Sequence, residues 1–438
     1  MGGSARELPT TMKLRNDQGR ESLHHRDIPT RAHQKERAFG PNPLEYSKYN
    51  RQQATTGRED RGSLNFFARR VYSGFTGEGP YSTRMHVDNR LSLFDFTRAE
   101  LGAFFQGLGE PRFRADQVFI NVYQRRTLDF LEMTDLPKSL RKELETRIDP
   151  KGSVESARRR SPAQDAIKLL WRLQDGHHIE SVLMQADYGE TLCFSTQVGC
   201  AFRCSFCVTG KMGRLRNLTP GEIVSQIFQH LAESLFSKGP NLVAMGMGEP
   251  MDNLDALLKA MEILQDPKGL NIAGRRMTVS TVGVVPGIER LARENPSVAL
   301  ALSLNATTNE VRSELMPVTR KYPIEVLIPA VEAYARASER RVTLEYVLIK
   351  GLNDSREDAE RLGRIAQRFP SKVNVIPFNP SDLFDYERPD PERVDAFAKW
   401  LWPFQTTVTV RYSKGLDIQA ACGQLGYDQV KSRLAAEA

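Results

Sequence analysis

Apolar residues first recur at helical spacing after residue 90. Positions three or four apart share one face of a helix, and an apolar stripe on that face packs against a core. Two such stripes follow each other: Leu101, Phe104, Phe105 and Leu108, then Phe113, Val118, Phe119 and Val122. Pro137 suits the first turn of a third helix that continues through Arg147. The pattern between residues 92 and 148 therefore predicts a small accessory domain of three short helices.

Downstream of this helical region, the pattern changes to strands. Two runs, at 166–171 and 178–183, are typical of β-strands. Six further strand-like runs lie at 191–197, 242–247, 277–281, 298–304, 342–349 and 372–377. Helical patterns separate them at 219–236, 253–265, 286–293, 323–337 and 355–368, with another near 391–402. This alternation predicts a series of βα units.

The six later strands indicate how the units are arranged. Most are nearly continuous in apolar or β-branched residues, as in Ser297–Leu302, which is typical of parallel strands covered by helices on both faces. An eight-unit barrel needs about 250 residues, and the roughly 215 residues here fit six units better. We therefore expect an α/β fold, a partial and open (β/α)6 barrel with a small helical domain before it. In such folds the chemistry lies at the carboxyl ends of the strands.

Composition excludes several classes of protein. A chain of 438 residues, 40% of them hydrophobic, can bury a core of ordinary size. No apolar run approaches the ~18 residues that a membrane-spanning helix needs. The formal net charge is +7, but the first 84 residues, with 15 Lys or Arg and 9 Asp or Glu, carry most of it. The high isoelectric point is therefore weak support for nucleic-acid binding by the folded part.

This basic N-terminal stretch has few apolar residues and no clear period, so we expect a disordered extension over residues 1–88. It lacks the layout of a secretory signal. One interpretation is an arm that attracts RNA phosphates. The alternative, which the composition favours, is a dispensable extension or a stretch upstream of a start at Met85.

Five cysteines in 438 residues are too few, and odd in number, for a disulfide scaffold. They indicate a reducing compartment such as the cytoplasm. Cys200, Cys204 and Cys207 have the spacing C-x3-C-x2-C on the loop after the 191–197 strand. Three thiolates form a soft site for zinc or an iron–sulfur cluster. A structural zinc takes four ligands, so the zinc alternative would borrow Cys193 or Cys422.

Polar residues also follow the other predicted strands. The turn Met245-Gly246-Met247-Gly248-Glu249-Pro250 ends the second strand; its glycines allow close backbone approach to a ligand, and Glu249 is an acceptor suited to an ammonium group. The polar side chains at later strand ends are Ser280, Ser303, Asn305 and Asn379. For each of them the alternative is a helix cap or a turn.

The two isolated cysteines differ in context. Cys193 lies within a predicted strand, where a buried, inert thiol is natural. Cys422 lies between two alanines and a glycine, and there the same interpretation fits less well.

The cysteine loop and the Gly-Glu-Pro turn resemble the radical S-adenosylmethionine (SAM) enzymes. Further strings make the resemblance narrower: Gln197–Cys200, Leu344–Val347 and Ala420–Leu425, with Phe113–Val118 and Met133–Leu136 in the helical region. Together they resemble the adenine-C2 RNA methyltransferases of the RlmN type, over residues 92 to 428 approximately.

The resemblance implies cofactors and roles. A [4Fe–4S] cluster would be held by Cys200, Cys204 and Cys207, with SAM on its fourth iron and two SAM molecules used per turnover. Cys422 would carry a methyl group, Cys193 would release the product by forming a disulfide, and Glu180 would remove the proton from carbon 2. The alternative for Glu180 is a solvent-facing strand residue. The positions that match SAM contacts are Gly248, Glu249, Ser280, Ser303, Leu304, Asn305 and Asn379.

Two positions depart from the family pattern. The family usually has histidine where this chain has Asn305, and the loop 381–390 lacks the family's glycine. Asparagine still offers a donor and an acceptor. The changed loop is expected to alter the rim of the substrate site.

The resemblance also implies partners. These are an adenine in 23S ribosomal RNA and in transfer RNA, flipped out of its stack, and an electron donor of the flavodoxin or ferredoxin type. We expect a monomer with no membrane association. Four basic residues near the site would hold phosphates or be solvated: Arg214, Arg216, Arg411 and Lys414. Other functions left open are methylation of adenine carbon 8, a non-methylating radical SAM reaction, and a non-catalytic zinc or RNA-binding role.

These inferences divide the chain into five parts. The extension is 1–88, the helical accessory domain 89–150, and a linker or β extension 151–188. The radical SAM core is expected at 189–412 and the C-terminal segment with Cys422 at 413–438.

Overall fold

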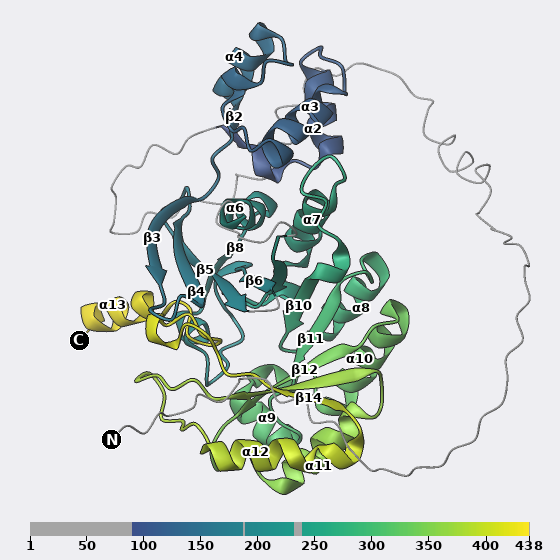
Figure 1. The fold of residues 1–438 in the computed structure, drawn as a ribbon, viewed down its shortest axis with the longest axis vertical. Helices are drawn as coiled ribbons and strands as arrows, with labels where there is room; N and C mark the ends of the chain where they lie inside the picture. The colour runs from purple at the N-terminus through teal and green to yellow at the C-terminus, as the bar shows by residue number, and fades with distance from the viewer. Residues whose placement is uncertain (1–89, 187–188, 232–238, 438) are drawn as a thin grey trace, which may run out of the picture. The chain divides into compact units, whose positions relative to one another are not determined.

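The computed structural model describes residues 90–186, 189–231 and 239–437 (Figure 1). The expected basic extension lies outside these described residues. Within them, no helix combines the length and the apolar character needed to cross a bilayer.

The helical region forms as predicted, from three short helices. They are α2 (Arg98–Gly107), α3 (Arg114–Phe119), which a single π-helical segment η2 (Ile120–Gln124) continues, and α4 (Lys138–Arg147), which begins directly after Pro137. Thr97 caps α2 in a capping box with Glu100, which satisfies two backbone N–H groups at the helix start. Short elements complete the region: β1 (Leu91–Ser92), η1 (Leu93–Asp95), η3 (Phe130–Glu132) and β2 (Ile148–Asp149).

A ten-stranded sheet forms the centre of the fold. Its first strands are an antiparallel series, β3 (Val154–Arg160), β4 (Ala166–Arg172), β5 (His178–Ala186) and β6 (Gly189–Cys193). From β6 the sheet continues in parallel through β9 (Asn241–Ala244), β10 (Met277–Thr281), β11 (Ala299–Ser303), β12 (Val342–Leu348), β13 (Ser371–Pro377) and β14 (Thr407–Val410). Because β3 and β14 each have one neighbour, the sheet is open, as expected for a partial barrel.

Two strands of this sheet were not predicted. All residues of β3 are exposed, and β14 alternates between exposed and half-buried positions. Both are edge strands, so neither needs the continuous apolar run that marks a strand covered on both faces. The barrel therefore has seven parallel strands where the sequence predicted six.

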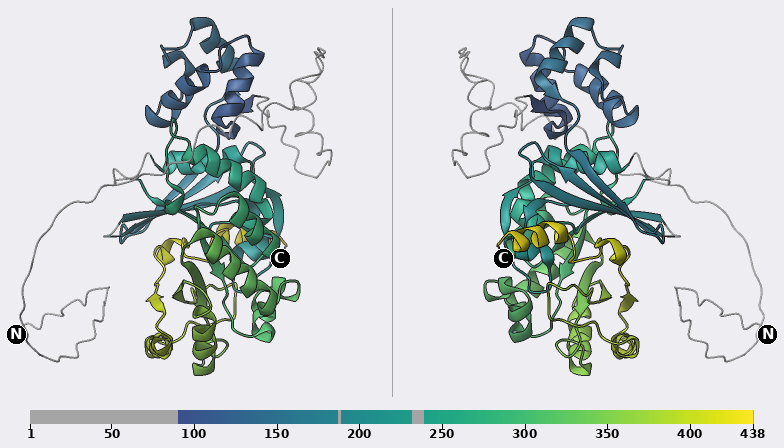
Figure 2. Two further views of the ribbon diagram at one scale, coloured as in Figure 1. Left: turned by 90° about the vertical axis from the view of Figure 1, so that its right-hand side faces the viewer. Right: turned by 90° about the vertical axis from the view of Figure 1, so that its left-hand side faces the viewer.

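Helices cover the outer side of the parallel strands, as Figures 1 and 2 show. They are α6 (Pro220–His230), α7 (Leu254–Gln265), α8 (Val285–Glu294), α10 (Ile324–Ser338), α11 (Arg356–Ala366) and α12 (Pro391–Trp400). The shorter elements are α5 (Val208–Met212), α9 (Asn309–Leu315), η4 (Pro250–Asn253), η5 (Gly274–Arg276), η6 (Pro317–Arg320), η7 (Trp402–Phe404) and η8 (Leu416–Ile418). The predicted helix 219–236 ends at His230 in α6, and residues 232–238 lie outside the described part.

The helical region packs against the first barrel helices. The Asp95 carboxylate accepts the Gly221 N–H at 2.6 Å at the start of α6, and Arg98 donates to Asp266 after α7 at 2.9 Å. At the other end of the chain, α13 (Tyr427–Glu437) lies beside the antiparallel strands, where Arg159 pairs with Asp428 at 3.0 Å (Figure 1).

The predicted strand 191–197 is divided in the structure. It forms β6 and then β7 (Gln197–Gly199), which pairs antiparallel with β8 (Arg214–Asn217). The loop between β7 and β8 carries the cysteine motif. Gly199 has φ +75°, and a Cβ there would lie 1.8 Å from the Gly213 carbonyl oxygen, so only glycine fits this pairing.

A fully buried arginine fixes the ends of two central strands. The guanidinium of Arg312 donates to the carbonyls of Val282, Ser303 and Leu304, and to the Thr319 hydroxyl. Four acceptors therefore satisfy its donors inside the protein, which is the condition for burying such a group. The carboxyl ends of β10 and β11 are thereby held together.

Candidate active site

The cysteine loop carries three thiols, and Cys200 and Cys207 both act electrostatically on Cys204. Cys200 and Cys204 are buried, and Cys207 is half-buried. The Cys207 N–H donates to the Cys204 carbonyl at 3.1 Å, which closes the turn between them. Burial, with a smaller effect of the nearby Cys207, raises the pKa of the Cys200 thiol to about 12.

A cluster is compatible with this donor set. Three soft sulfur ligands on one short loop suit a [4Fe–4S] group with one iron left for another ligand. Within the described ranges, no group of three or more His, Cys, Asp or Glu side chains is spaced to hold a metal ion. The assignment of the three cysteines therefore stays a prediction, carried by their motif and by the cavity beside them.

An open cavity of about 920 Å³ lies at the carboxyl ends of the barrel strands. Its wall includes nine of the residues singled out from the sequence, namely Cys204, Cys207, Gly248, Glu249, Ser280, Ser303, Asn305, Asn379 and Cys422. Residues from six separate parts of the chain thus meet at one site. Parallel strands explain this convergence, because their carboxyl ends share one edge.

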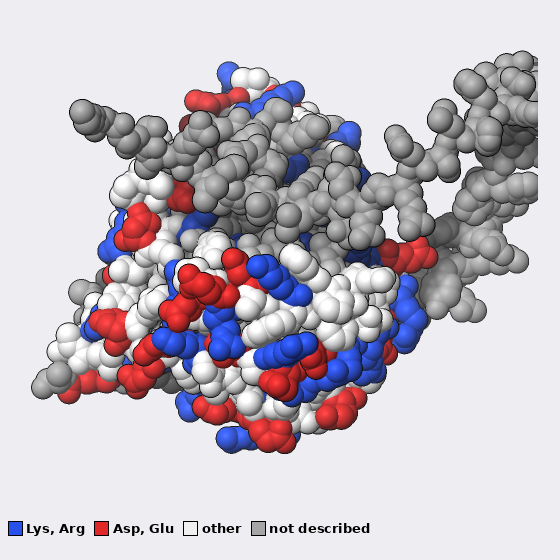
Figure 3. Space-filling view, turned by 60° about the horizontal axis from the view of Figure 1, so that its bottom comes forward, with Lys and Arg blue, Asp and Glu red and all other residues white. Residues whose placement is uncertain are grey.

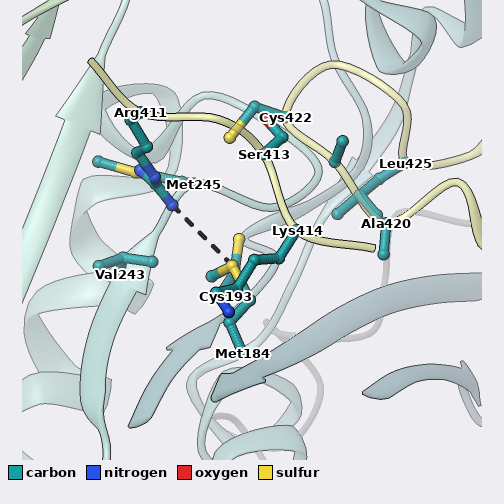
Figure 4. Close-up of a pocket in the computed structure, with 11 residues that line it drawn as sticks. Met184, Cys193, Val243, Met245, Arg411, Ser413, Lys414, Ala420, Cys422 and Leu425 are labelled. Carbon is teal, nitrogen blue, oxygen red and sulfur yellow. Dashed lines mark hydrogen bonds between the residues drawn. The ribbon is translucent and has the colours of Figure 1, made fainter. Parts of the chain in front are cut away.

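A smaller cavity of about 400 Å³ adjoins the first (Figure 4). Cys193 and Cys422 both line it, and Met245, Arg411 and Cys422 line both cavities. Arg411 reaches toward Met184, with its Nη2 3.9 Å from the sulfur. Cys422 is therefore the one cysteine, of the five, that borders both spaces.

The environment of Cys193 suppresses its ionisation. Burial, with a smaller effect of the neighbouring Cys422, raises the pKa of this thiol from 9.0 to about 12, against the lowering effect of the Arg411 charge. The thiolate is the nucleophilic form of cysteine. Cys193 is thus a protonated thiol at neutral pH, with one cation placed to favour its thiolate.

Glu249 is held by the turn that carries it. Its two carboxylate oxygens accept the N–H groups of Met251 at 3.1 Å and Val282 at 2.9 Å. Burial raises the pKa of Glu249 to about 7, against the lowering effect of these bonds. The carboxylate joins the end of β9 to the end of β10 and still borders the larger cavity.

Gly248 was expected to allow close approach of a ligand, and the structure shows that it also packs closely against Gln197. Its φ is +102°, and a Cβ would lie 2.6 Å from the Gln197 side chain. Glycine is therefore required here for close packing on β7, in addition to any approach of a ligand.

Some of the side chains predicted to contact the cofactor at the ends of β10 and β11 form hydrogen bonds with other protein groups. The hydroxyl oxygens of Ser280 and Ser303 lie 3.4 Å apart on the cavity wall. The side-chain oxygen Oδ1 of Asn305 accepts the Val347 N–H at 2.9 Å, and its side-chain nitrogen Nδ2 lies 3.2 Å from the Met316 sulfur. Asn305 thus ties β11 to β12.

Leu304 differs from these residues. Its side chain is fully buried in the hydrophobic core and is not part of the cavity wall. Its backbone N–H donates to the Glu345 carbonyl at 3.0 Å, and its carbonyl accepts from Arg312 at 3.0 Å.

Asn379 positions the segment that carries Cys422. Its amide nitrogen donates to the Cys422 carbonyl at 3.0 Å and to the Ser413 hydroxyl at 2.9 Å. Its amide oxygen accepts from Arg388 at 3.1 Å. The side chain joins the end of β13 to the C-terminal segment.

Glu180 lies on β5 and lines neither cavity. It is 2% exposed, so the alternative of a solvent-facing residue is wrong. Its carboxylate accepts from Lys168 at 3.4 Å and from the Gly426 N–H at 3.0 Å. Burial raises the pKa of Glu180, and the Lys168 charge opposes that effect.

Lys168 was not recognised from the sequence. It is buried on β4 and also donates to the Gln419 carbonyl at 3.2 Å. The only local signal was a lysine inside an apolar strand, between Ile167 and Leu169.

The four basic residues considered for phosphate binding differ in their surroundings. Arg216 donates to both carboxylate oxygens of Glu222 at 2.7 and 2.8 Å, which is a bidentate structural pair. Arg214 pairs with Asp252 at 2.6 Å, and Lys414 with Asp165 at 3.5 Å. Arg411 borders both cavities.

The distribution of surface charge does not identify a nucleic-acid site on the face that Figure 3 shows. On the face shown in Figure 3, lysine and arginine side chains lie among aspartate and glutamate side chains. Several form ion pairs within one helix, such as Arg356 with Glu360 at 3.1 Å. The substrate class therefore has to come from the cavities.

Comparisons with known proteins agree with this geometry. Residues 194–362 match the model of the radical SAM superfamily, and residues 91–149 match that of the ribosomal RNA large subunit methyltransferase N-terminal domain. A dual-specificity RNA methyltransferase RlmN of Syntrophotalea carbinolica is 45% identical over 78% of this chain and 91% of its own length. The RlmN protein of Geobacter sulfurreducens is 43% identical over 77% and 93%.

A solved structure is similar over the same region. The crystal structure of a radical SAM methyltransferase from Sphaerobacter thermophilus has 44% sequence identity and a TM-score of 0.73. The match covers 76% of this chain and 99% of that one.

The burial of Cys193 makes its reactivity depend steeply on pH. We expect its alkylation by iodoacetamide, followed by peptide mass spectrometry, to rise roughly tenfold per pH unit and to keep rising between pH 9 and 10. The reason is a thiol pKa of about 12, well above the ordinary 9.0. Replacement Arg411→Met should slow the reaction, since it removes the cation that favours the thiolate. A rate that levels off by pH 9 would contradict this environment for Cys193.

Proposed function

Because the chain belongs to the RlmN family of radical SAM RNA methyltransferases, we propose that it methylates carbon 2 of an adenine in 23S ribosomal RNA and in transfer RNA. The observation that carries the proposal is the position of Cys422. It borders the larger cavity beside Cys204 and Cys207, and it shares the smaller one with Cys193.

The chemistry requires an intermediate carrier of the methyl group. Carbon 2 of adenine is electron-poor and does not attack the methyl group of a sulfonium ion. The radical SAM family implies a [4Fe–4S] cluster and SAM, and Cys200, Cys204 and Cys207 would hold that cluster. When bound, it would supply the electron that cleaves SAM to a 5′-deoxyadenosyl radical. We propose two SAM molecules per turnover, one to methylate Cys422 and one for the radical.

Cys422 is placed to act as the carrier. The 5′-deoxyadenosyl radical would take a hydrogen atom from its S-methyl group and leave a carbon radical, which adds to carbon 2 and links the protein to RNA. The adduct would then lose one electron, which the cluster would accept, and the proton on carbon 2, which restores the aromatic ring. Asn379, through the Cys422 carbonyl, keeps this residue at the larger cavity. The thiol of Cys193, across the smaller cavity, then attacks the sulfur of Cys422. A disulfide forms as the bond from that sulfur to the RNA-linked carbon breaks; this carbon keeps the electron pair of the bond and takes up the proton that Cys193 loses, which makes it the methyl group of the product.

All five cysteines are free thiols in the structure. We propose that a disulfide between Cys193 and Cys422 forms in each turnover. A reductant must restore both thiols before the next methyl transfer.

Glu180 is the proposed base for the proton on carbon 2. Its buried carboxyl has a raised pKa, which suits a base that works near neutral pH. The Gly426 N–H, four residues beyond Cys422, occupies one of its oxygens.

The remaining partners follow from the family. We propose an electron donor of the flavodoxin or ferredoxin type, a monomeric enzyme and a cytoplasmic location. SAM would contact Gly248, Glu249, Ser280, Ser303 and Asn379, with Asn305 and Leu304 contributing through their end of β11.

Nucleoside analysis tests the reaction and its position on the ring. RNA modified by the cluster-loaded enzyme should contain 2-methyladenosine, and replacement Cys422→Ala should abolish it because the methyl carrier is lost. SAM cleavage to 5′-deoxyadenosine should persist in this variant, which serves as the control for a folded, loaded protein. Detection of 8-methyladenosine in place of 2-methyladenosine would assign the sister activity, and full methylation by Cys422→Ala would refute the carrier.

Replacement Glu180→Gln tests the base. The amide keeps an acceptor for the Gly426 N–H but cannot take a proton, so turnover should fall by about 100-fold or more. Methylation of Cys422 itself should continue, since that step needs no base at carbon 2. The double variant Lys168→Met with Glu180→Gln controls for the unpaired buried lysine. Near-normal turnover of Glu180→Gln would show that Glu180 only anchors the C-terminal segment.

A further inference from the structure

One carboxylate on the wall of the larger cavity has no role in the mechanism above. Glu345 lies in the middle of β12 and is 6% exposed. Its Oε1 accepts from the Asn374 amide on β13 at 3.0 Å. Its Oε2 is buried and has no hydrogen-bond partner among the described residues.

A buried acceptor without a donor is costly, and such groups in folded proteins call for an explanation. A ligand that brings an N–H or O–H into the cavity would satisfy it. Two positively charged side chains favour the ionised form of Glu345, which accepts hydrogen bonds. Burial raises the pKa of its carboxyl, while the positive charges of Arg411 and Lys372 lower it.

The position of Glu345 relates it to the reacting thiols. The charge of Arg411 acts on both Glu345 and Cys193, and Arg411 and Cys422 also line the larger cavity. Glu345 therefore borders the space in which the RNA base would meet the methyl carrier.

Adenine offers one kind of strong donor, the exocyclic amine at carbon 6, while its ring nitrogens N3 and N7 are acceptors. Guanine presents an oxygen at the same place. A carboxylate oxygen accepts from the amine and repels the oxygen. A carboxylate at this site therefore distinguishes the two purines.

We propose that Glu345 Oε2 accepts a hydrogen bond from the exocyclic amine of the target adenine, and so selects adenine over 6-oxopurines. This inference rests on the proposed function. SAM also contains an adenine with the same amine, so the test must distinguish binding of the RNA adenine from binding of the SAM adenine.

The experiment uses the cluster-loaded full chain and two RNAs that differ at the target position alone. One carries adenosine, and the other carries purine riboside, which lacks the exocyclic amine but keeps the hydrogen on carbon 2. The replacement is Glu345→Gln. Asn374 donates to the Oε1 position, so the glutamine oxygen is expected to occupy that position and its NH2 group to occupy the position of Oε2. The replacement therefore exchanges the acceptor at Oε2 for a donor. Replacement Glu357→Gln, exposed on α11, is the matched control.

The expected result is a loss of about 10- to 100-fold in kcat/KM for Glu345→Gln on the adenosine RNA, as for a hydrogen bond to a charged group, with a change below about 3-fold on purine riboside. The dissociation constant of SAM, measured by equilibrium dialysis without RNA, should stay the same. An equal loss of kcat/KM on both RNAs would overturn the inference. A similar weakening of SAM binding would also overturn it, because Glu345 would then bind the exocyclic amine of SAM and not that of the RNA base. Failure of the wild-type enzyme to methylate either RNA would instead refute the proposed function.

Discussion

The segment that bears Cys422 is fixed by hydrogen bonds to buried side chains of the sheet, and the arrangement of both cavities depends on them. Asn379 holds the Cys422 carbonyl, and Glu180 holds the Gly426 N–H. Lys168 completes the attachment through the Gln419 carbonyl. These bonds connect residues up to 251 positions apart in sequence. They place the Cys422 thiol where it borders both cavities. The proposed mechanism needs this position, because the thiol would react first with a cofactor and later with a second thiol.

Burial then sets the state of the groups around that thiol. The same loss of water raises the pKa of Glu249 to about 7 and that of Cys193 to about 12. In each case a specific contact opposes this rise in pKa. For Glu249 the contacts are hydrogen bonds from backbone N–H groups, and for Cys193 the contact is the charge of Arg411. Burial therefore raises the pKa values of acids and thiols at this site, while fixed donors and charges favour the ionised forms. This is a common way for a site to match pKa values to its chemistry.

The sequence predicted most of the fold and the site because their signals are local. A short cysteine motif and a Gly-Glu-Pro turn follow two consecutive parallel strands, and parallel topology alone brings such turns together. The strands β3 and β14 were missed because exposed edge strands lack an apolar run. Pairing of Lys168 with Glu180 and of Glu180 with Gly426 depends on the tertiary fold. The unpartnered oxygen of Glu345 is likewise visible only once its neighbours are known.

The central claim is that Cys422 is joined covalently to the RNA base and that Cys193 releases it. Mass spectrometry of the Cys193→Ala enzyme after reaction with RNA and SAM tests this most directly. Since the releasing thiol is absent, the account predicts a stable adduct in which the peptide containing Cys422 carries an adenine nucleotide through a single bridging carbon. Free methylated RNA with no adduct, or an adduct on another residue, would contradict the account.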